Sequence, residues 1–133
     1  MDSKIVRFSV SLSIADGKFD AFEKLAEAML AATRRNPGAL GFDWYLSSDR
    51  RHCRLLETYV DADAVIAQIS GPVVHEFIPK MLAVAALDSF EVYGDPGPQA
   101  SAMLAGFGAV TFAPWLFLQT PQTAVTRDHS VVG

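Results

Sequence analysis

The stretch from Glu57 to Leu82, ETYVDADAVIAQISGPVVHEFIPKML, constrains the fold most, because it carries the signals of a strand and of two helix starts in succession. Residues 54–60 are rich in side chains that favour strands. Asp61 and Asp63 are good helix N-caps, and residues 62–69 place apolar side chains at helical spacing. The sequence therefore predicts a strand followed directly by a short helix.

A second helical region follows and is expected to be interrupted. Gly71 ends the first helix, Pro72 suits the first turn of the next, and His75 falls within that turn. Pro79 lacks the N–H that would bond the carbonyl oxygen of His75, so the segment that continues to about Val84 is expected to bend there.

The remaining strands and a long helix complete the pattern. Residues 4–14 alternate apolar and polar side chains, as a half-buried strand does. Residues 18–36 carry one apolar stripe and predict an amphipathic helix. Residues 40–47 and 53–60 predict a hairpin, and residues 87–94 predict a final strand. One face of that final strand is expected to carry Leu87, Ser89, Glu91 and Tyr93.

The order β, α, β, β, α, β predicts an α+β fold of the ferredoxin-like kind, with a four-stranded antiparallel sheet and its helices on one face. We expect this domain to span residues 1–97. Residues 98–133 form a C-terminal extension, in which the apolar segment 110–118 has no clean period. The extension is expected to pack on its own domain or on a dimer mate, with a lid over a ligand site as the alternative. Residues 122–133 are polar enough to be loose.

Composition narrows the class of protein. The 133 residues are 50% hydrophobic and 20% charged, which suits one globular domain. A net charge of −4 without a basic block argues against nucleic-acid binding, and no apolar run is long enough to predict a membrane span. Cys53 is the single cysteine, and the N-terminus shows no secretion signal. A cytoplasmic location is therefore the expectation.

Two titratable residues are candidates for catalysis. The imidazole of His75 exchanges protons near neutral pH, and this residue either reaches inward to a pocket or lies at the helix boundary in a structural role. Glu57 lies mid-strand among apolar neighbours, where a carboxylate must find hydrogen-bond donors or take up a proton. It is either a base or a structural partner of an arginine or a helix end.

Aromatic residues are candidates for the walls of a flat ligand cavity, and ordinary core packing is the alternative for each of them. They are Phe42, Trp44, Tyr59, Phe77 and Phe90. No metal site is expected, because the histidines and the cysteine lack the spacing of metal ligands.

The order Glu57, Tyr59, Asp61, then a short helix, a Pro-led turn and His75, resembles the second half of the antibiotic biosynthesis monooxygenase family. The phrase NPGALGFDWYLSSD resembles a passage in the first half of that family, and the likeness covers residues 4–94. The resemblance implies a dimeric α/β barrel, in which two subunits pair through the open sheet face, and hence a homodimer.

Gln68 departs from the family pattern, since many members carry His at this place. The haem-degrading branch carries Trp there and a further His one turn beyond residue 75, where this chain has Ile78. That branch also carries Asn on the first strand, where this chain has Ser or Val. Haem degradation is therefore disfavoured, and no cofactor is expected.

The resemblance implies a cofactor-independent monooxygenase that oxidises an electron-rich aromatic molecule, such as an anthrone, a quinol or a polyketide-like compound, with O₂. In this hypothesis His75 is the base, Trp44 and Tyr59 hold the ring, and Glu57 or Gln68 orients a hydroxyl group. A non-catalytic dimeric barrel, which binds a small hydrophobic molecule or serves as an interaction module, is the alternative. An isomerase or decarboxylase that uses the same base without O₂ is a third hypothesis.

Overall fold

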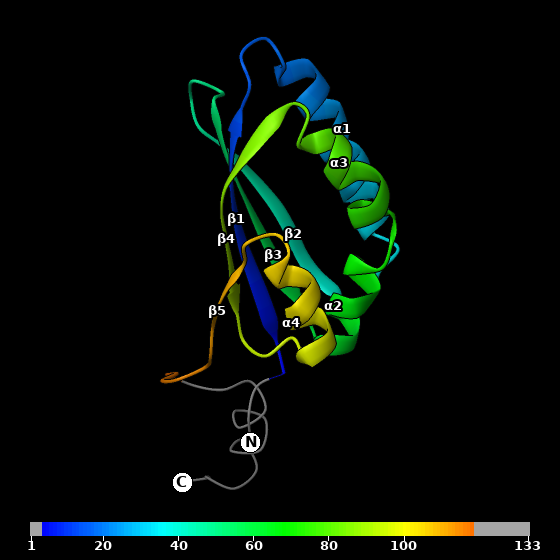
Figure 1. Cartoon of the computed structure of the whole chain (residues 1–133), viewed down its shortest axis with the longest axis vertical. Helices are drawn as coiled ribbons and strands as arrows, with labels where there is room; N and C mark the ends of the chain where they lie inside the picture. Colours follow the sequence, from blue (N-terminus) through cyan, green and yellow to red (C-terminus); the bar gives the residue numbers. More distant parts are fainter. Residues whose placement is uncertain (1–3, 119–133) are drawn as a thin grey trace, which may run out of the picture.

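The computed structural model describes residues 4–118, and within them one sheet carries the helices on one of its faces (Figure 1). In chain order the elements are β1 (Val6–Ile14), α1 (Phe19–Thr33), β2 (Ala39–Leu46), β3 (His52–Tyr59), α2 (Ala62–Ile69), the π-helical turn η1 (Val73–Phe77), α3 (Ile78–Met81), β4 (Ala85–Tyr93), α4 (Pro98–Ala105) and β5 (Val110–Phe112). None of the helices between residues 4 and 118 has the length and apolar character of a membrane span.

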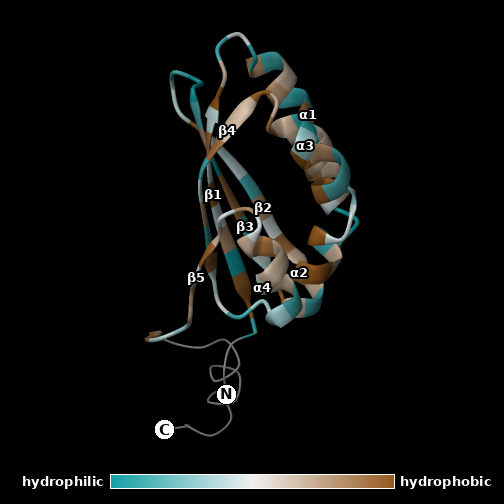
Figure 2. Ribbon diagram, in the orientation of Figure 1, coloured by the Kyte–Doolittle hydropathy of each residue, from teal (hydrophilic) through white to brown (hydrophobic). Residues whose placement is uncertain are grey.

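The predicted ferredoxin-like core is confirmed. β1 lies between β3 and β4 and is antiparallel to both, while β2 and β3 form the predicted hairpin. Hydrophobic and hydrophilic residues alternate along these strands (Figure 2). The inward side chains of β1 are buried in the core: Val6, Phe8, Val10, Leu12 and Ile14.

The prediction of four antiparallel strands is wrong in one detail, because the sheet has a fifth strand. β5 pairs in parallel with β4, so the order is β2-β3-β1-β4-β5 and the sheet is mixed. α4 connects the two strands, and a helical crossover returns the chain in the same direction beside the strand it left. A strand of three residues is too short to show an alternating pattern in the sequence.

The predicted faces of β4 also need a correction at Leu87. Ser11 pairs with Ser89 and Leu12 with Leu87, so Asp88 is an extra residue on β4. Such a bulge reverses the alternation along the strand. Leu87 therefore points inward with Phe90, rather than outward with Ser89 as predicted.

The second helical region is interrupted, as predicted. It divides into α2, η1 and α3, and Pro79 lies in the first turn of α3. Because Pro79 has no N–H to donate, the regular bonding pattern cannot run through this segment, and a wider π-helical turn takes its place. Asp61 caps α2 as predicted, since its side chain accepts a hydrogen bond of 2.9 Å from the backbone N–H of Ala64.

A tight loop joins α1 to β2 and packs against the start of α2. Asn36 Nδ2 donates a hydrogen bond of 3.0 Å to the carbonyl oxygen of Ala64, and its Oδ1 accepts one of 3.1 Å from the N–H of Gly38. Gly38 lies so close to α2 that an added Cβ would stand 2.4 Å from Ala64 Cβ. The loop therefore has room for glycine alone at this position.

Gly38→Ala is expected to destabilise the fold by about 1–3 kcal/mol, because the new methyl group overlaps a packed side chain. Gly41→Ala is the matched control, since a Cβ there meets nothing closer than 3.4 Å. Urea unfolding followed by circular dichroism checks this expectation. Equal free energies of unfolding for the two variants would contradict the close packing of the loop on α2.

Candidate active site

An apolar cavity lies between the inner face of the sheet and the helices. Its volume is about 80 Å³, and its lining comes from β1, β2, β3, β4, the helices α1 to α3 with η1, and the segment around α4. Phe8, Phe42 and Phe90 supply aromatic walls, and Leu104 of α4 closes one part. Glu57 is the one titratable side chain in this lining.

Glu57 is held in apolar surroundings by the register of the sheet. Its direct neighbours across the strands are Phe8 on β1 and Phe42 on β2. The hydroxyl group of Tyr59, two residues along the same face, donates a hydrogen bond to Glu57 Oε1. Burial raises the pKa of Glu57 from 4.5 to about 7, although the hydrogen bond from Tyr59 acts in the opposite direction. The carboxyl group therefore exchanges its proton near neutral pH.

Tyr59 is a fixed partner of this carboxyl group. Its side chain is fully buried, and its ring lies 5.2 Å from that of Phe8. Burial and the neighbouring Glu57 carboxylate both raise the pKa of Tyr59 above its ordinary value, so the phenol keeps its proton. Tyr59 is thus placed to donate to Glu57 rather than to line the cavity.

Gln68 lines the cavity, but its amide group is engaged by the protein. Nε2 donates a hydrogen bond of 2.9 Å to Thr33 Oγ1 at the end of α1, and Oε1 accepts one of 3.3 Å from Asn36 Nδ2. Thr33 Oγ1 in turn donates to the carbonyl oxygen of Met29 over 2.8 Å. Gln68 therefore ties α2 to the end of α1 beside the cavity.

Trp44 lines the cavity with an unused donor. Its ring meets those of Phe22 and Phe42 edge-on, at 6.0 and 5.7 Å between centroids. The indole Nε1 is buried and has no hydrogen-bond partner in the described part of the chain. Since buried donors are almost always paired, this N–H is a candidate contact for a ligand.

His75 lies outside the cavity, so of its two predicted positions the structure favours the helix boundary over the inward one. Its side chain is exposed, whereas Val73, Val74 and Ile78 of the same segment line the cavity. Phe77 does not line the cavity either; Lys80 Nζ lies 5.9 Å from the centre of its ring. The catalytic role of His75 stays a prediction that this geometry does not support.

Sequence reasoning missed several cavity residues. Phe8 belongs to the alternating strand predicted over residues 4–14, but alternation along one strand does not indicate that Phe8 pairs with Glu57 on β3. Leu104 and Phe107 come from the C-terminal extension, and no sequence pattern indicates that this extension reaches the cavity.

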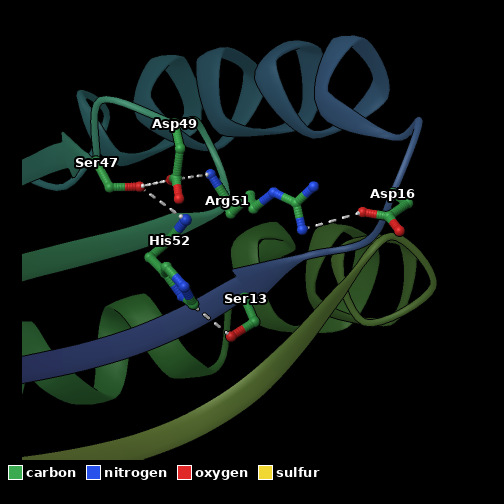
Figure 3. Close-up of polar contacts among 6 residues, drawn as sticks. All are labelled: Ser13, Asp16, Ser47, Asp49, Arg51 and His52. Atoms are coloured by element: carbon green, nitrogen blue, oxygen red, sulfur yellow. Dashed lines mark hydrogen bonds and ion pairs between the residues drawn. The ribbon is translucent and has the colours of Figure 1, made fainter.

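A separate polar cluster lies at the hairpin end of the sheet (Figure 3). Asp49 Oδ1 accepts hydrogen bonds of 2.7 Å from Ser47 Oγ and 3.0 Å from the N–H of Arg51, and the first of these mainly lowers the pKa of Asp49. Arg51 also lies 3.8 Å from Asp16. These groups are exposed or at the surface and order the β2–β3 turn. Across residues 4–118, no group of three or more His, Cys, Asp or Glu side chains is placed to hold a metal ion.

Comparisons with known proteins support the fold. The family model of the antibiotic biosynthesis monooxygenases matches residues 5–80, and the chain belongs to this family. No curated protein sequence matches the chain.

Several solved structures share the fold. MupZ from Pseudomonas fluorescens superposes with a TM-score of 0.71 at 19% identity, over 90% of this chain and 97% of that one. SnoaB from Streptomyces nogalater, a cofactor-independent oxygenase, gives 0.61 at 16% identity, over 71% and 96% of the two chains. Rv0793 from Mycobacterium tuberculosis gives 0.58 at 18% identity, over 70% and 97%.

The raised pKa of Glu57 predicts a pH-dependent stability. The folded protein holds the proton more tightly than the unfolded chain, so the stabilisation is complete below pH 4.5, falls as the pH rises to about 7, and changes no further above that. Glu57→Gln, which stays neutral, is expected to exceed the wild type in free energy of unfolding by about 3 kcal/mol at pH 8, and to match it near pH 4.

Glu91→Gln is the matched control, because Tyr93 donates the same kind of hydrogen bond to Glu91 on the outer face of the sheet, where Tyr93 is 40% exposed. Urea unfolding at a series of pH values measures both variants. A Glu57→Gln variant that follows the wild-type pH dependence would show that Glu57 is not buried as described.

Proposed function

We propose that the protein is a cofactor-independent monooxygenase that oxidises a neutral, electron-rich aromatic molecule with O₂. The observation that carries the proposal is the carboxyl group of Glu57, which has a pKa of about 7 and faces an apolar cavity. A general base works best when its pKa is near the working pH. Membership of the monooxygenase family supports the reaction class, and SnoaB offers a cofactor-independent example with the same fold.

Glu57 would act by taking a proton from the substrate. For an anthrone, loss of a C–H proton leaves an electron-rich carbanion that reduces O₂ directly. In the overall reaction the CH₂ group becomes C=O, one oxygen atom enters the product and the other leaves as water, so the four electrons come from the substrate. The protein has to supply a base and surroundings from which water is excluded.

The charge of the lining favours a neutral substrate. The residues around the cavity include no Lys, Arg or His that would offset a negative charge on a ligand. An anionic ligand beside Glu57 would be repelled by the carboxylate. It would also lose its hydration, which is unfavourable. Phe8, Phe42 and Phe90 offer aromatic faces for a flat ring.

A non-catalytic barrel, which binds a small hydrophobic molecule or serves as an interaction module, is the second candidate function, and the volume of about 80 Å³ favours the interaction module. Pockets for drug-sized ligands begin at about 300 Å³, so the cavity as it stands is small for a three-ring substrate. An isomerase or decarboxylase would use Glu57 as a base without O₂, and oxygen consumption separates it from the monooxygenase.

We also propose a homodimer in which a second copy covers the outer face of the sheet. This face presents Leu56 and Tyr45, which are 42% and 56% exposed, and the helices leave it uncovered (Figure 1). Beside it, the segment after β5 exposes Trp115 and Phe117 by 87% and 51%. Apolar surface of this extent is typical of protein interfaces. The described part of the C-terminal extension would thus contact the second copy.

Oxygen uptake with a panel of anthrones and naphthols tests the activity. Glu57→Gln is expected to lower kcat by about 100-fold or more, because the base is lost. His75→Ala, at an exposed position outside the cavity, serves as the control and is expected to keep the wild-type rate. In the wild type, kcat/KM should rise with pH to a plateau above about pH 7. Turnover that survives Glu57→Gln but not His75→Ala would transfer the base role to His75.

Light scattering on a sizing column tests the dimer. Leu56→Glu places a charge on the outer face and is expected to give a monomer, whereas Leu40→Glu, at a site 59% exposed beside α1, should leave the dimer intact. A wild-type monomer, or a Leu56→Glu variant that remains dimeric, would refute this interface.

A further inference from the structure

We infer that the indole of Trp44 is a movable wall, through which an aromatic ligand enters the cavity from a second hollow between α1 and β2. The inference rests on the proposed function only in requiring that the cavity binds an aromatic molecule.

The size of the cavity requires a wall to move. An enclosed apolar cavity of about 150 Å³ is known to accept benzene, and the cavity around Glu57 is about 80 Å³. A flat ring therefore does not fit until one of the lining side chains changes position.

Two residues of the cavity lining have space behind them: Phe42 borders a hollow of about 190 Å³, and Trp44 borders another and also carries the unpaired N–H. The hollow behind Trp44 has a volume of about 220 Å³ and is bordered on α1 by Phe22, Ala26 and Leu30, among others. The cavity and this hollow share Trp44 and no other residue of their linings. If the indole turns aside, they join into a chamber at the lower end of the range of small-molecule pockets, about 300 Å³.

Within the described residues, no hydrogen bond holds the indole in place. Nε1 is buried without a partner, and the neighbouring rings of Phe22 and Phe42 meet it edge-on. An unpaired buried donor is unfavourable, so the closed position lacks a stabilising contact that a ligand or water would give. By contrast, Gln68, which also lines the cavity, is fixed at both ends of its amide.

The polar groups of the chamber define the class of ligand. The indole N–H is a donor only, so it calls for an acceptor such as a ring carbonyl, while Glu57 accepts from or donates to a hydroxyl. Glu23 and Glu27 border the outer hollow, and Arg50 is the cation that touches its lining, with Cζ 4.9 Å from the centre of the Phe19 ring. The ligand class is therefore a neutral, hydroxylated aromatic ketone.

Binding of 1-hydroxyanthraquinone tests the route, because this compound has the required carbonyl and hydroxyl groups and is already oxidised. Its absorbance change is followed by stopped flow. Trp44→Ala is expected to speed association by about tenfold, since the wall is gone. Phe77→Ala, which removes an aromatic ring that borders neither the cavity nor the outer hollow, is the control and should leave the association rate within about twofold.

Two more variants separate the wall from the hydrogen bond. Ala26→Trp fills the outer hollow and is expected to slow association by about tenfold while Trp44 remains. Trp44→Phe keeps an aromatic wall without the N–H and is expected to weaken equilibrium binding by about fivefold.

Association rates that are the same in the wild type, Trp44→Ala and Ala26→Trp would overturn the route. A wild type that binds no probe would overturn it as well. Because the probe is not turned over, either result leaves the oxygen-uptake assay to decide on the monooxygenase activity separately.

Discussion

The central constraint in this structure is one carboxyl group that is buried in an apolar cavity, with a single hydrogen bond from the side chains of residues 4–118. Glu57 lies between Phe8 and Phe42 on the neighbouring strands, and Tyr59 is its hydrogen-bond partner in the described residues. Such a group is unfavourable as an anion, and its pKa rises to about 7. The ionised carboxylate of Glu57 therefore lowers the stability of the fold above neutral pH. At the same pH this carboxylate is able to act as a base. Perturbed groups of this kind cluster at functional sites.

The rest of the fold keeps the surroundings of Glu57 in place. β1 and β2 flank the strand that carries it, and the helices cover it from one side (Figure 1). Thr33, Gln68 and Asn36 form a buried polar tie between the end of α1 and α2, so this side of the cavity is rigid. Trp44 also lines the cavity, and its indole has no hydrogen-bond partner among residues 4–118. A fixed Gln68 and a Trp44 that is free to turn suit a cavity that must open for a ligand.

Much of the fold is predictable from the sequence. The alternation of apolar and polar residues along a strand, and the spacing of apolar residues along a helix, indicate which side chains are buried. The strands β1 to β3, the long helix and the interruption near Pro79 are predicted on these grounds. The errors have local causes. The bulge at Asp88 reverses the alternation in β4, so that Leu87 lies on the other face from the one predicted. β5 is too short to show an alternating pattern. At the site, Glu57 is predictable as a buried carboxylate, but the direction of His75 depends on the π-helical turn, which no sequence pattern fixed.

The protonation of Glu57 is measured most directly by infrared spectroscopy, in which a protonated carboxyl group has a carbonyl stretch distinct from that of a carboxylate. The band that disappears in Glu57→Gln belongs to this residue. The account predicts that the band is present at pH 5 and is lost with a midpoint near pH 7. A band that is already absent at pH 5 would show that Glu57 is an ordinary, well-solvated carboxylate, and would contradict the central claim.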